Sequence, residues 1–445
     1  MINPNASSAA ISIGRQRVVK HHRVKKPVMS DTQTLNYDPV SASVWAALAR
    51  ANAQSAAPSV TVEIADAAQL ADLRADWNDL LIRAAAPNIF MDPALVRVAA
   101  ATDPESKHRS LLAWKSIGGR RQLVGIWTFA VGSAGKLASL MPVLIIPPCR
   151  YGYLATPVID RNCLDDTLDA MLDCIAADPE LPKIVSLDMM ATDGPTYRAL
   201  LEVLARRGSE PCIFEQSHRP KLASKLDGKD YLANALSSST RKKLRQHRRR
   251  LSEQGALTSA VVSEFDAVQR ALEEFLAMEA SGWKGRQGTA LLSDQTDAAF
   301  MRGAVGALAE LGCASIHSLY LNAKPVSMQI VLRSGAAAFT WKTAYDESFQ
   351  DFSPGMLLLE DYTAAFLADK SIAFVDSCSF DDTGFMSAWS ERQLVADLWI
   401  DARRGGSLEF RALSTIQKHG RRLRAAAKHV YLAWCNSNWR KSLNR

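Results

Sequence analysis

The chain of 445 residues has few of the features that mark membrane, secreted or metal-binding proteins. Its most apolar run, residues 140–148, is short and interrupted by proline, which argues against a transmembrane helix. The seven cysteines are scattered without a C-x-x-C pair, a pattern that fits reduced cytosolic thiols better than a disulfide frame or a zinc site. The eight histidines form no ligand pattern either, so no metal is expected.

Two further features are missing from the sequence. The amino terminus has no apolar stretch of the kind found in secretory signals, which makes the cytoplasm the expected location. No Ser-His-Asp or Cys-His arrangement stands out, so the sequence does not point to a protein nucleophile.

The positive charge of the chain is concentrated at its two ends. The formal net charge is +7, yet residues 61–402 contain 35 basic and 43 acidic residues. Residues 1–60 contain seven Lys or Arg and two Asp, and residues 403–445 contain eleven Lys or Arg and one Glu. Because the middle of the chain is mildly acidic, a general DNA-binding function is disfavoured.

The pattern of apolar residues predicts an α/β protein with two similar halves. Residues 1–58 lack sustained periodicity and are expected to form a disordered basic leader. Residues 59–210 and 211–402 each show helix, hairpin, helix and strand signals in that order. Residues 403–445 are expected to form a basic tail that contains an amphipathic segment. We therefore expect two domains with mixed central sheets flanked by helices.

The stretch TWKTAYDESFQDFSPGMLLLEDY, residues 340–362, predicts a strand, a turn and a helix. Ser353 suits the N-cap, Pro354 suits the first helical turn, and Gly355 leaves room for a ligand beside the backbone. The free N–H groups and the dipole of such a helix start favour a phosphate or a carboxylate. The alternative is a helix start that binds nothing.

Two other groups of residues have a chemical and a structural interpretation. Glu279, Trp283 and Lys284 lie in a glycine-rich loop, which indicates either a binding loop or a surface loop over a tucked-in tryptophan. Lys342 on one strand and Asp376 at the end of the next would point from adjacent strands. This pattern indicates either a cleft or a structural Lys–Asp pair.

These residues and their order resemble the GNAT-type acyltransferases of the CelD/BcsL class, the cellulose-biosynthesis-associated acetyltransferase family, which are related to FemAB-type aminoacyl transferases. The resemblance covers about residues 60–400. Its segments in the second half are residues 237–255, 275–291, 316–335 and 339–361. The chain departs from the family after Asp376, where Trp389 with Glu391 and Arg392 takes the place of a Gly and a Tyr-Lys pair before a closing Trp.

The resemblance implies tandem GNAT-like domains with an acyl-CoA site in the second. Acetyl-CoA or another acyl-CoA would be a co-substrate, with no tightly bound cofactor. Backbone N–H groups of the strand before the helix would stabilise the oxyanion. The residues implied to bind the co-substrate are Phe339, Thr340, Trp341, Ser353, Pro354, Gly355 and Met356. The catalytic candidates are Glu279, Asp346 and Asp376 as base and Tyr345 as acid, and the candidates for substrate binding are Trp283, Lys284, Lys342, Arg241 and Arg245.

Three functions remain open at this level. The first is an acyl-CoA-dependent N- or O-acyltransferase that acts on a glycan precursor or another small amine or hydroxyl. The second is a FemAB-type aminoacyl transferase that uses charged tRNA, and the third is a non-catalytic subunit of a polysaccharide-synthesis assembly. The tail could hold the protein at the inner face of a membrane. The basic segment 237–255 is either a solvated face or a rim that attracts phosphates, and it is least expected to bind DNA.

Overall fold

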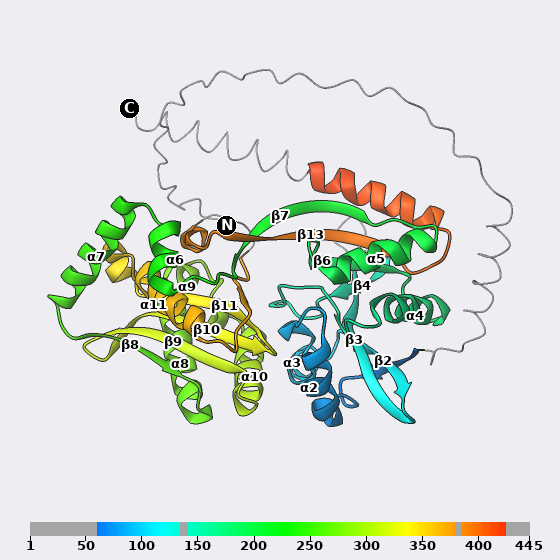
Figure 1. Cartoon of the computed structure of the whole chain (residues 1–445), viewed down its shortest axis with the longest axis horizontal. Helices are drawn as coiled ribbons and strands as arrows, with labels where there is room; N and C mark the ends of the chain where they lie inside the picture. The colour runs from blue at the N-terminus through cyan, green and yellow to red at the C-terminus, as the bar shows by residue number, and fades with distance from the viewer. Residues whose placement is uncertain (1–59, 134–140, 380–383, 424–445) are drawn as a thin grey trace, which may run out of the picture. The chain divides into compact units, whose positions relative to one another are not determined.

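The computed structural model describes residues 60–133, 141–379 and 384–423 (Figure 1). All of them belong to one compact unit, Pro58–Arg445. The predicted leader and the part of the tail beyond residue 423 lie outside the described residues. None of the described helices combines the length and the apolar character that crossing a membrane requires.

The first half of the fold runs from the first strand to residue 206. Its elements are β1 (Thr61–Asp66), η1 (Ala71–Leu73), α2 (Arg74–Arg83), η2 (Ile89–Met91), α3 (Pro93–Thr102), β2 (His108–Ile117), β3 (Arg120–Ser133), β4 (Pro142–Ile146), β5 (Val158–Ile159), α4 (Leu164–Ala177), β6 (Ile184–Ala191) and α5 (Pro195–Arg206).

The second half repeats the same kind of order. Its elements are β7 (Cys212–Leu222), α6 (Gly228–Ala235), α7 (Ser238–Ser252), β8 (Leu257–Val262), α8 (Phe265–Ser281), α9 (Trp283–Arg286), η3 (Leu291–Ser293), α10 (Gln295–Glu310), β9 (Ala314–Leu321), β10 (Lys324–Ser334), β11 (Ala337–Tyr345), η4 (Glu347–Phe352), α11 (Pro354–Ala368), β12 (Phe374–Asp376), η5 (Phe385–Ala388) and β13 (Glu391–Asp401). A further helix follows over residues 408–423.

One large mixed sheet joins the two halves. Its strand order is β1-β2-β3-β4-β6-β13-β7-β12-β11-β10-β9-β8, with β5 attached to β3. The order is symmetric about its centre, because β4 and β6 pair in parallel in the first half as β11 and β12 do in the second. The predicted α/β class, with a mixed sheet flanked by helices, is therefore confirmed.

The centre of the sheet is made by two exchanged strands. Strand β7 follows the first half in the chain but pairs with β12, and β13 at the end of the second half returns to pair with β6. The two strands also pair with each other along most of their length. The division between residues 59–210 and 211–402 thus falls between two halves that share one sheet.

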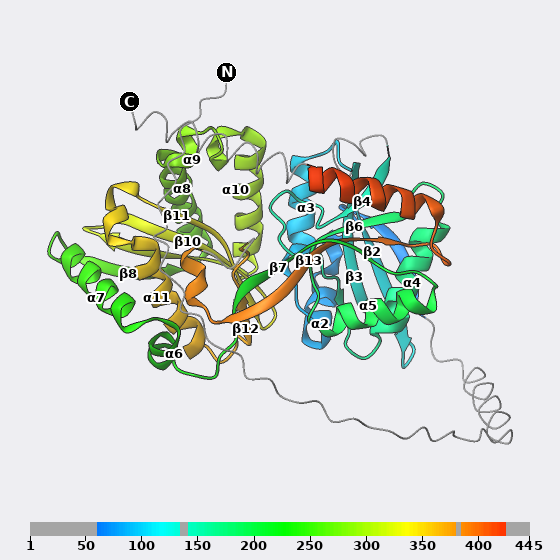
Figure 2. The same cartoon turned by 90° about the horizontal axis from the view of Figure 1, so that it is seen from above.

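The helices cover the strands of the second half on both faces (Figure 2). Helix α8 buries Val268, Leu272, Phe275 and Leu276, which recur at three- and four-residue spacing, together with α10 on one face. Helices α6, α7 and α11 cover the other face. Phe90 of the first half belongs to the same core as α8 and α10, so the hydrophobic core continues across the junction.

The sequence predicts a helix start at Asp92 and Pro93 and hairpin turns at residues 118–121 and 322–325, and the structure contains all three. Asp92 caps α3 with Pro93 at its first position, and Gly118 and Gly119 turn the first hairpin with positive φ. Asn322 and Ala323 turn the second hairpin, also with positive φ. The strands β4 and β13 and the helix α6 had no counterpart among the expected elements. The amphipathic segment is expected over residues 416–435, and its described part, up to residue 423, belongs to the helix that starts at residue 408.

Candidate active site

Strand β11 has an open edge at its carboxyl end. Its parallel pairing with β12 covers Ala337 to Phe339 and ends where Asp376 ends β12. The remainder of β11, up to Tyr345, continues without a strand partner on that side in the described part of the chain. A parallel pair that diverges in this way exposes backbone N–H and C=O groups that a ligand can contact.

A β-bulge lies in this same stretch. Ile330 of β10 faces Lys342, whereas the next residue, Val331, faces Thr340, so Trp341 is the extra residue. A bulge breaks the alternation of side chains along a strand. The consecutive residues Trp341 and Lys342 consequently both contact the segment that follows β4: Trp341 Nε1 donates to the Tyr151 carbonyl at 2.8 Å, and Lys342 Nζ donates to Tyr153 Oη at 2.7 Å.

The ammonium group of Lys342 lies among aromatic rings. Its Nζ is 4.0 Å from the centre of the Tyr151 ring and 5.2 Å from that of Tyr153. Burial, with a contribution from the nearby Lys284 ammonium, lowers the pKa of Lys342 to about 8. Burial also raises the pKa of Tyr153, so its hydroxyl stays protonated. The predicted candidate Lys342 is thus an amine that changes charge close to neutral pH.

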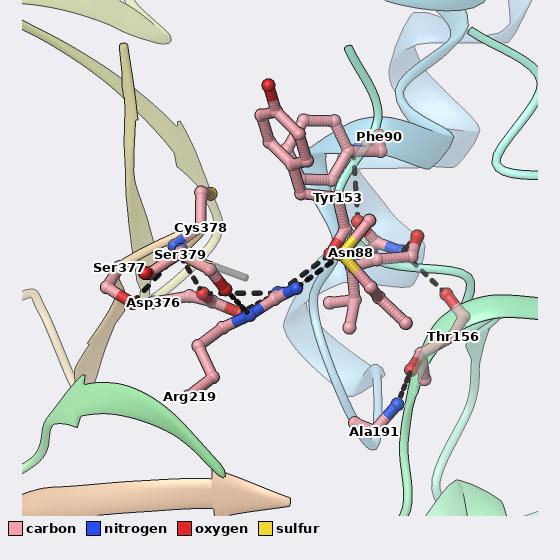
Figure 3. Close-up of polar contacts among 12 residues, drawn as sticks. Asn88, Phe90, Tyr153, Thr156, Ala191, Arg219, Asp376, Ser377, Cys378 and Ser379 are labelled. Atoms are coloured by element: carbon pink, nitrogen blue, oxygen red, sulfur yellow. Dashed lines mark hydrogen bonds and ion pairs between the residues drawn. The ribbon is translucent and has the colours of Figure 1, made fainter. Parts of the chain in front are cut away.

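Asp376 lies beside this cluster but is engaged elsewhere (Figure 3). Its carboxylate accepts from Arg219 Nη1 at 3.3 and 3.4 Å and from the Cys378 N–H at 2.7 Å, and both side chains of the ion pair are buried. The same Arg219 nitrogen donates to the Tyr153 carbonyl at 2.7 Å. The partner of Asp376 is therefore Arg219 and not Lys342, and the pair connects the end of β12 to the first half.

Glu279, Trp283, Lys284 and Tyr345, which the sequence analysis named from separate segments, lie around one small pocket. Glu279 is buried at the end of α8, where it accepts from Lys284 Nζ at 2.5 Å and from the Leu291 N–H at 2.8 Å. Trp283 is 47% exposed, so it is not tucked under the loop. The expected loop contains the short helix α9 instead.

Glycine has a specific role at this junction between α8 and α9. A Cβ on Gly285 would lie 1.7 Å from the Ala280 carbonyl oxygen. Only glycine permits this close approach, which places Lys284 next to Glu279.

Asp346 and Glu347 lie just beyond the end of β11. Partial burial acts to raise the pKa of Asp346, but hydrogen bonds from Lys324 and Ser348 outweigh it, and the pKa is lowered. Asp346 accepts from Lys324 Nζ at 2.7 Å, and Glu347 accepts from Arg286 and from the Trp283 N–H, each at 2.6 Å. The hydrogen bond from Arg286 lowers the pKa of Glu347 as well. Glu347 lines the pocket and holds the backbone of Trp283, whereas Asp346 is not among the residues that line it.

The helix start at residue 353 differs in one detail from its prediction. Ser353 occupies the N-cap position of α11 with Pro354 after it, but its φ is +51° and its side chain makes no capping hydrogen bond. Its carbonyl accepts from the N–H groups of Met356 and Leu357 at 2.9 and 3.2 Å. A Cβ on Gly355 would meet nothing within 4 Å, so this side of the helix start is open.

Helix α7, the basic segment, packs beside this helix start. Leu244, His247 and Leu251 face inward, and the His247 ring contacts the ring of Phe352 in η4. Arg248 donates to the Leu357 carbonyl at 3.0 Å and to Asp361 at 2.8 Å. The cations that remain on the outer face of the helix are Lys242, Lys243, Arg245, Arg249 and Arg250, while Arg241 is half-buried.

Three residues of this site escaped the sequence analysis. Tyr151 and Tyr153 follow the apolar run that ends in Pro147 and Pro148, and that run was considered only as a membrane segment. Arg219 lies within a strand, where a single buried arginine cannot be told from an exposed one by alternation. The signal in the sequence that could have drawn attention to Tyr151 and Tyr153 is the occurrence of two tyrosines within five residues after Pro148.

Comparison with known proteins supports the fold. Residues 238–382 match the family model described as acetyltransferase (GNAT) domain. The match includes α8, β11 and α11. It spans less than half of the chain, and no curated protein matches the chain.

Several solved structures resemble the whole described unit. The structure of FemX has a TM-score of 0.51 at 12% identity, and the alignment covers 77% of this chain and 98% of that one. A tandem GNAT protein from the clavulanic acid biosynthesis pathway aligns over 78% of this chain and 99% of its own, at 13% identity and a TM-score of 0.39. The C-terminal domain of a putative lysylphosphatidylglycerol synthetase from Agrobacterium fabrum aligns over 75% of this chain and 92% of its own, at 14% identity and a TM-score of 0.45.

The fold is of the GNAT acyltransferase type. The domain match supports a transferase, and the likeness to FemX supports the two-half architecture. The narrower resemblance to the CelD/BcsL class is a prediction that these comparisons do not test.

Proposed function

We propose that the protein is an acyl-CoA-dependent N- or O-acyltransferase whose reaction takes place at the carboxyl end of β11. The observation that carries the proposal is the divergence of β11 from β12 after Phe339, next to the pocket of Glu279 and Lys284. A thioester that enters along the open edge would have its carbonyl beside backbone N–H groups of Thr340 to Thr343. Such fixed donors stabilise the oxyanion of acyl transfer.

The start of α11 supports the same orientation of acyl-CoA. The helix follows β11 through η4, its first turn contains no acidic residue, and Gly355 leaves its surface open. The dipole of a helix start attracts phosphate oxygens, and the backbone N–H of Gly355 lies at this end of α11. In this proposal the diphosphate of CoA lies near Ser353, Pro354, Gly355 and Met356, and the basic face of α7, with Arg241 and Arg245, forms a rim around it.

The acceptor would approach from the side of the pocket. Glu279 and Lys284 form an ion pair at its wall, and Trp283 and Tyr345 border it. An amine or hydroxyl held there attacks the thioester directly, so no protein nucleophile is required. Of the predicted carboxylate bases, Glu279 is the one that lines this pocket, where it is paired with Lys284, whereas Asp376 is buried against Arg219 and Asp346 is paired with Lys324. A glycan precursor is the acceptor that the CelD/BcsL resemblance implies.

Aminoacyl transfer from charged tRNA is a second candidate, and the outer face of α7 favours it. Its five cations lie on one side of a 15-residue helix without an acidic residue between them. A polyanion such as tRNA would bind such a face in a strongly salt-dependent way.

Titration calorimetry with acetyl-CoA, CoA and tRNA separates these functions. Under the proposal acetyl-CoA and CoA both bind, and acetyl-CoA loses its thioester when a panel of amino sugars and hydroxyl acceptors is added. Binding of tRNA with a steep salt dependence, together with no response to either CoA compound, would replace the proposal by the second candidate. No response to any of the three would favour the non-catalytic subunit.

A further inference from the structure

Lys342 is held by a residue from the other half of the molecule. Its Nζ donates to Tyr153 Oη at 2.7 Å, and Tyr153 belongs to the segment that follows β4. Because Trp341 is the extra residue of a bulge, Lys342 reaches this segment instead of pointing to the opposite face of the sheet. Gln329 supports the bulge, since its Nε2 donates to the Lys342 carbonyl at 3.0 Å.

The backbone of Tyr153 is fixed on both sides. Arg219, paired with Asp376, donates to its carbonyl at 2.7 Å. Asn88 donates to the carbonyls of the next residues, Leu154 and Thr156, at 2.9 and 2.7 Å. The rings of Phe90 and Tyr153 also pack edge to face (Figure 3). The position of the Tyr153 hydroxyl is therefore set by contacts that involve both halves.

We propose that Lys342 Nζ is the group that accepts the proton of the acceptor, and that Tyr153 is the positioning residue that holds it for this role. The inference rests on the proposed function, because it concerns the same open edge of β11. Among the candidates for catalysis and substrate binding, Lys342 and Tyr345 lie on the strand itself past the end of β12, and of these two Lys342 has the amine that can accept a proton. Tyr153 acts through Lys342 and needs no contact with the substrate.

The proton transfers balance in a single cycle. The neutral amine of Lys342 takes a proton from the acceptor nitrogen or oxygen while that atom forms a bond to the thioester carbonyl carbon. The carbon–sulfur bond then breaks, and the Lys342 ammonium returns the proton to the CoA thiolate. The products are the acylated acceptor and CoA thiol, and Lys342 is neutral again.

The neutral state of Lys342 depends on all the charged and titratable groups around it. Lys284 disfavours its charged form, whereas Glu279 and Asp297 favour it. The pKa values of the thiols of Cys149 and Cys378 are raised by burial, which keeps the thiols protonated. Lys342 is therefore predominantly charged at pH 7, with a minor neutral fraction that grows as the pH rises through about 8.

The test measures the protonation of Lys342 in the full-length protein without any substrate. Trace acetic anhydride labels lysines according to their neutral fraction, and mass spectrometry gives the midpoint for each one between pH 6 and 11. We expect a midpoint near pH 8 for Lys342, well below the ordinary value of a lysine side chain. Tyr153→Phe should lower the midpoint, because it removes an acceptor that favours the ammonium, and Lys284→Met should raise it.

A matched substitution controls for indirect effects on the fold. Tyr197 is buried in the first-half core, and Tyr197→Phe should leave the Lys342 midpoint unchanged. If the midpoint of Lys342 lies at the ordinary value of a lysine side chain, or if Tyr153→Phe and Tyr197→Phe have the same effect on it, the assignment of Tyr153 and Lys342 is overturned.

The kinetic arm uses acetyl-CoA with D-glucosamine and follows the release of CoA thiol. Lys342→Met should lower kcat by about 100-fold or more without weakening acetyl-CoA binding, and wild-type kcat should rise with pH and level off above about pH 9. If the Lys342→Met variant binds acetyl-CoA and keeps the kcat of the wild type, the inference is overturned and the proposed function stands. If acetyl-CoA does not bind the wild type, the proposed function fails, and the labelling still reports on Lys342.

Discussion

The two halves of the sheet differ at their equivalent pairs of parallel strands. In the first half β4 stops at Ile146 while its neighbour β6 continues to Ala191. In the second half β11 continues to Tyr345 while β12 stops at Asp376. The sequence explains the early end of β4, because Pro147 and Pro148 follow it directly and proline cannot donate to a strand ladder.

The space beyond the parallel pair is also used differently. In the first half the chain itself fills it, since Thr156 Oγ1 accepts from the Ala191 N–H at 3.2 Å and Asn88 holds the neighbouring carbonyls. In the second half the corresponding stretch of β11 borders a pocket. The next α-helix after each of these strands, α4 in the first half and α11 in the second, differs in charge at its start. Helix α4 has Asp165 and Asp166 in its first turn, whereas α11 has no acidic residue there.

The two halves share one arrangement of strands and helices but differ in what their strand ends and helix starts can bind. A helix start with two carboxylates repels phosphate, and a strand ended by prolines offers no edge to a thioester. Under the proposed function, the first half contributes Tyr151 and Tyr153 beside Lys342, and the second half holds the reactants.

The largest expected effect comes from breaking the connection between the halves. Arg219→Met leaves the Asp376 carboxylate buried without its partner, so the free energy of unfolding should fall by about 3–5 kcal/mol. Urea denaturation measures it, and the double variant Arg219→Met with Asp376→Asn should recover part of the loss. Arg302→Met removes the more exposed pair with Glu273 and should cost about 1 kcal/mol or less. Equal losses in the two single variants would mean that the buried pair does not hold the halves together.

The next effect distinguishes the two halves at their helix starts. Gly355→Glu places a carboxylate at the start of α11 in open space, so it should fold and weaken CoA binding by about 10-fold or more. Gly194→Glu is the matched control, because Gly194 is the N-cap of α5 in the first half and a Cβ there also meets nothing within 4 Å. Calorimetry should show normal CoA affinity in the control. If both variants bind CoA with normal affinity, or if both lose the binding, the proposed difference between the helix starts of the two halves is contradicted.

The smallest effect concerns the rim formed by α7. Lys242→Glu, Lys243→Glu and Arg245→Glu together change exposed cations without touching the contacts of Arg248. The KM for acetyl-CoA should rise several-fold at low salt, and the difference should shrink as salt increases. A change in solubility alone, with an unchanged KM, would show that this face of α7 is only solvated.

Local patterns in the sequence were enough to predict most of the elements. The hairpin at Gly118, the cap of α3 at Asp92 and the first helical position of α11 at Pro354 follow from the conformations that these residues favour. The grouping of Glu279, Trp283 and Lys284 also followed, because they lie within six residues of one another. Strand β13 was missed, because its buried residues do not follow a clean alternation across a bulge at Asp397.

The sequence by itself determined the α/β class, the repeated order of elements and which residues of the second half have side chains that can bind or react. Tertiary structure alone decided that β7 and β13 exchange between the halves, that Asp376 pairs with Arg219, and that Lys342 meets Tyr153 across 189 positions. The physical reason is that turns, caps and helix faces depend on neighbours in sequence. Ion pairs and pKa values depend instead on which distant groups the packed sheet brings within a few ångströms.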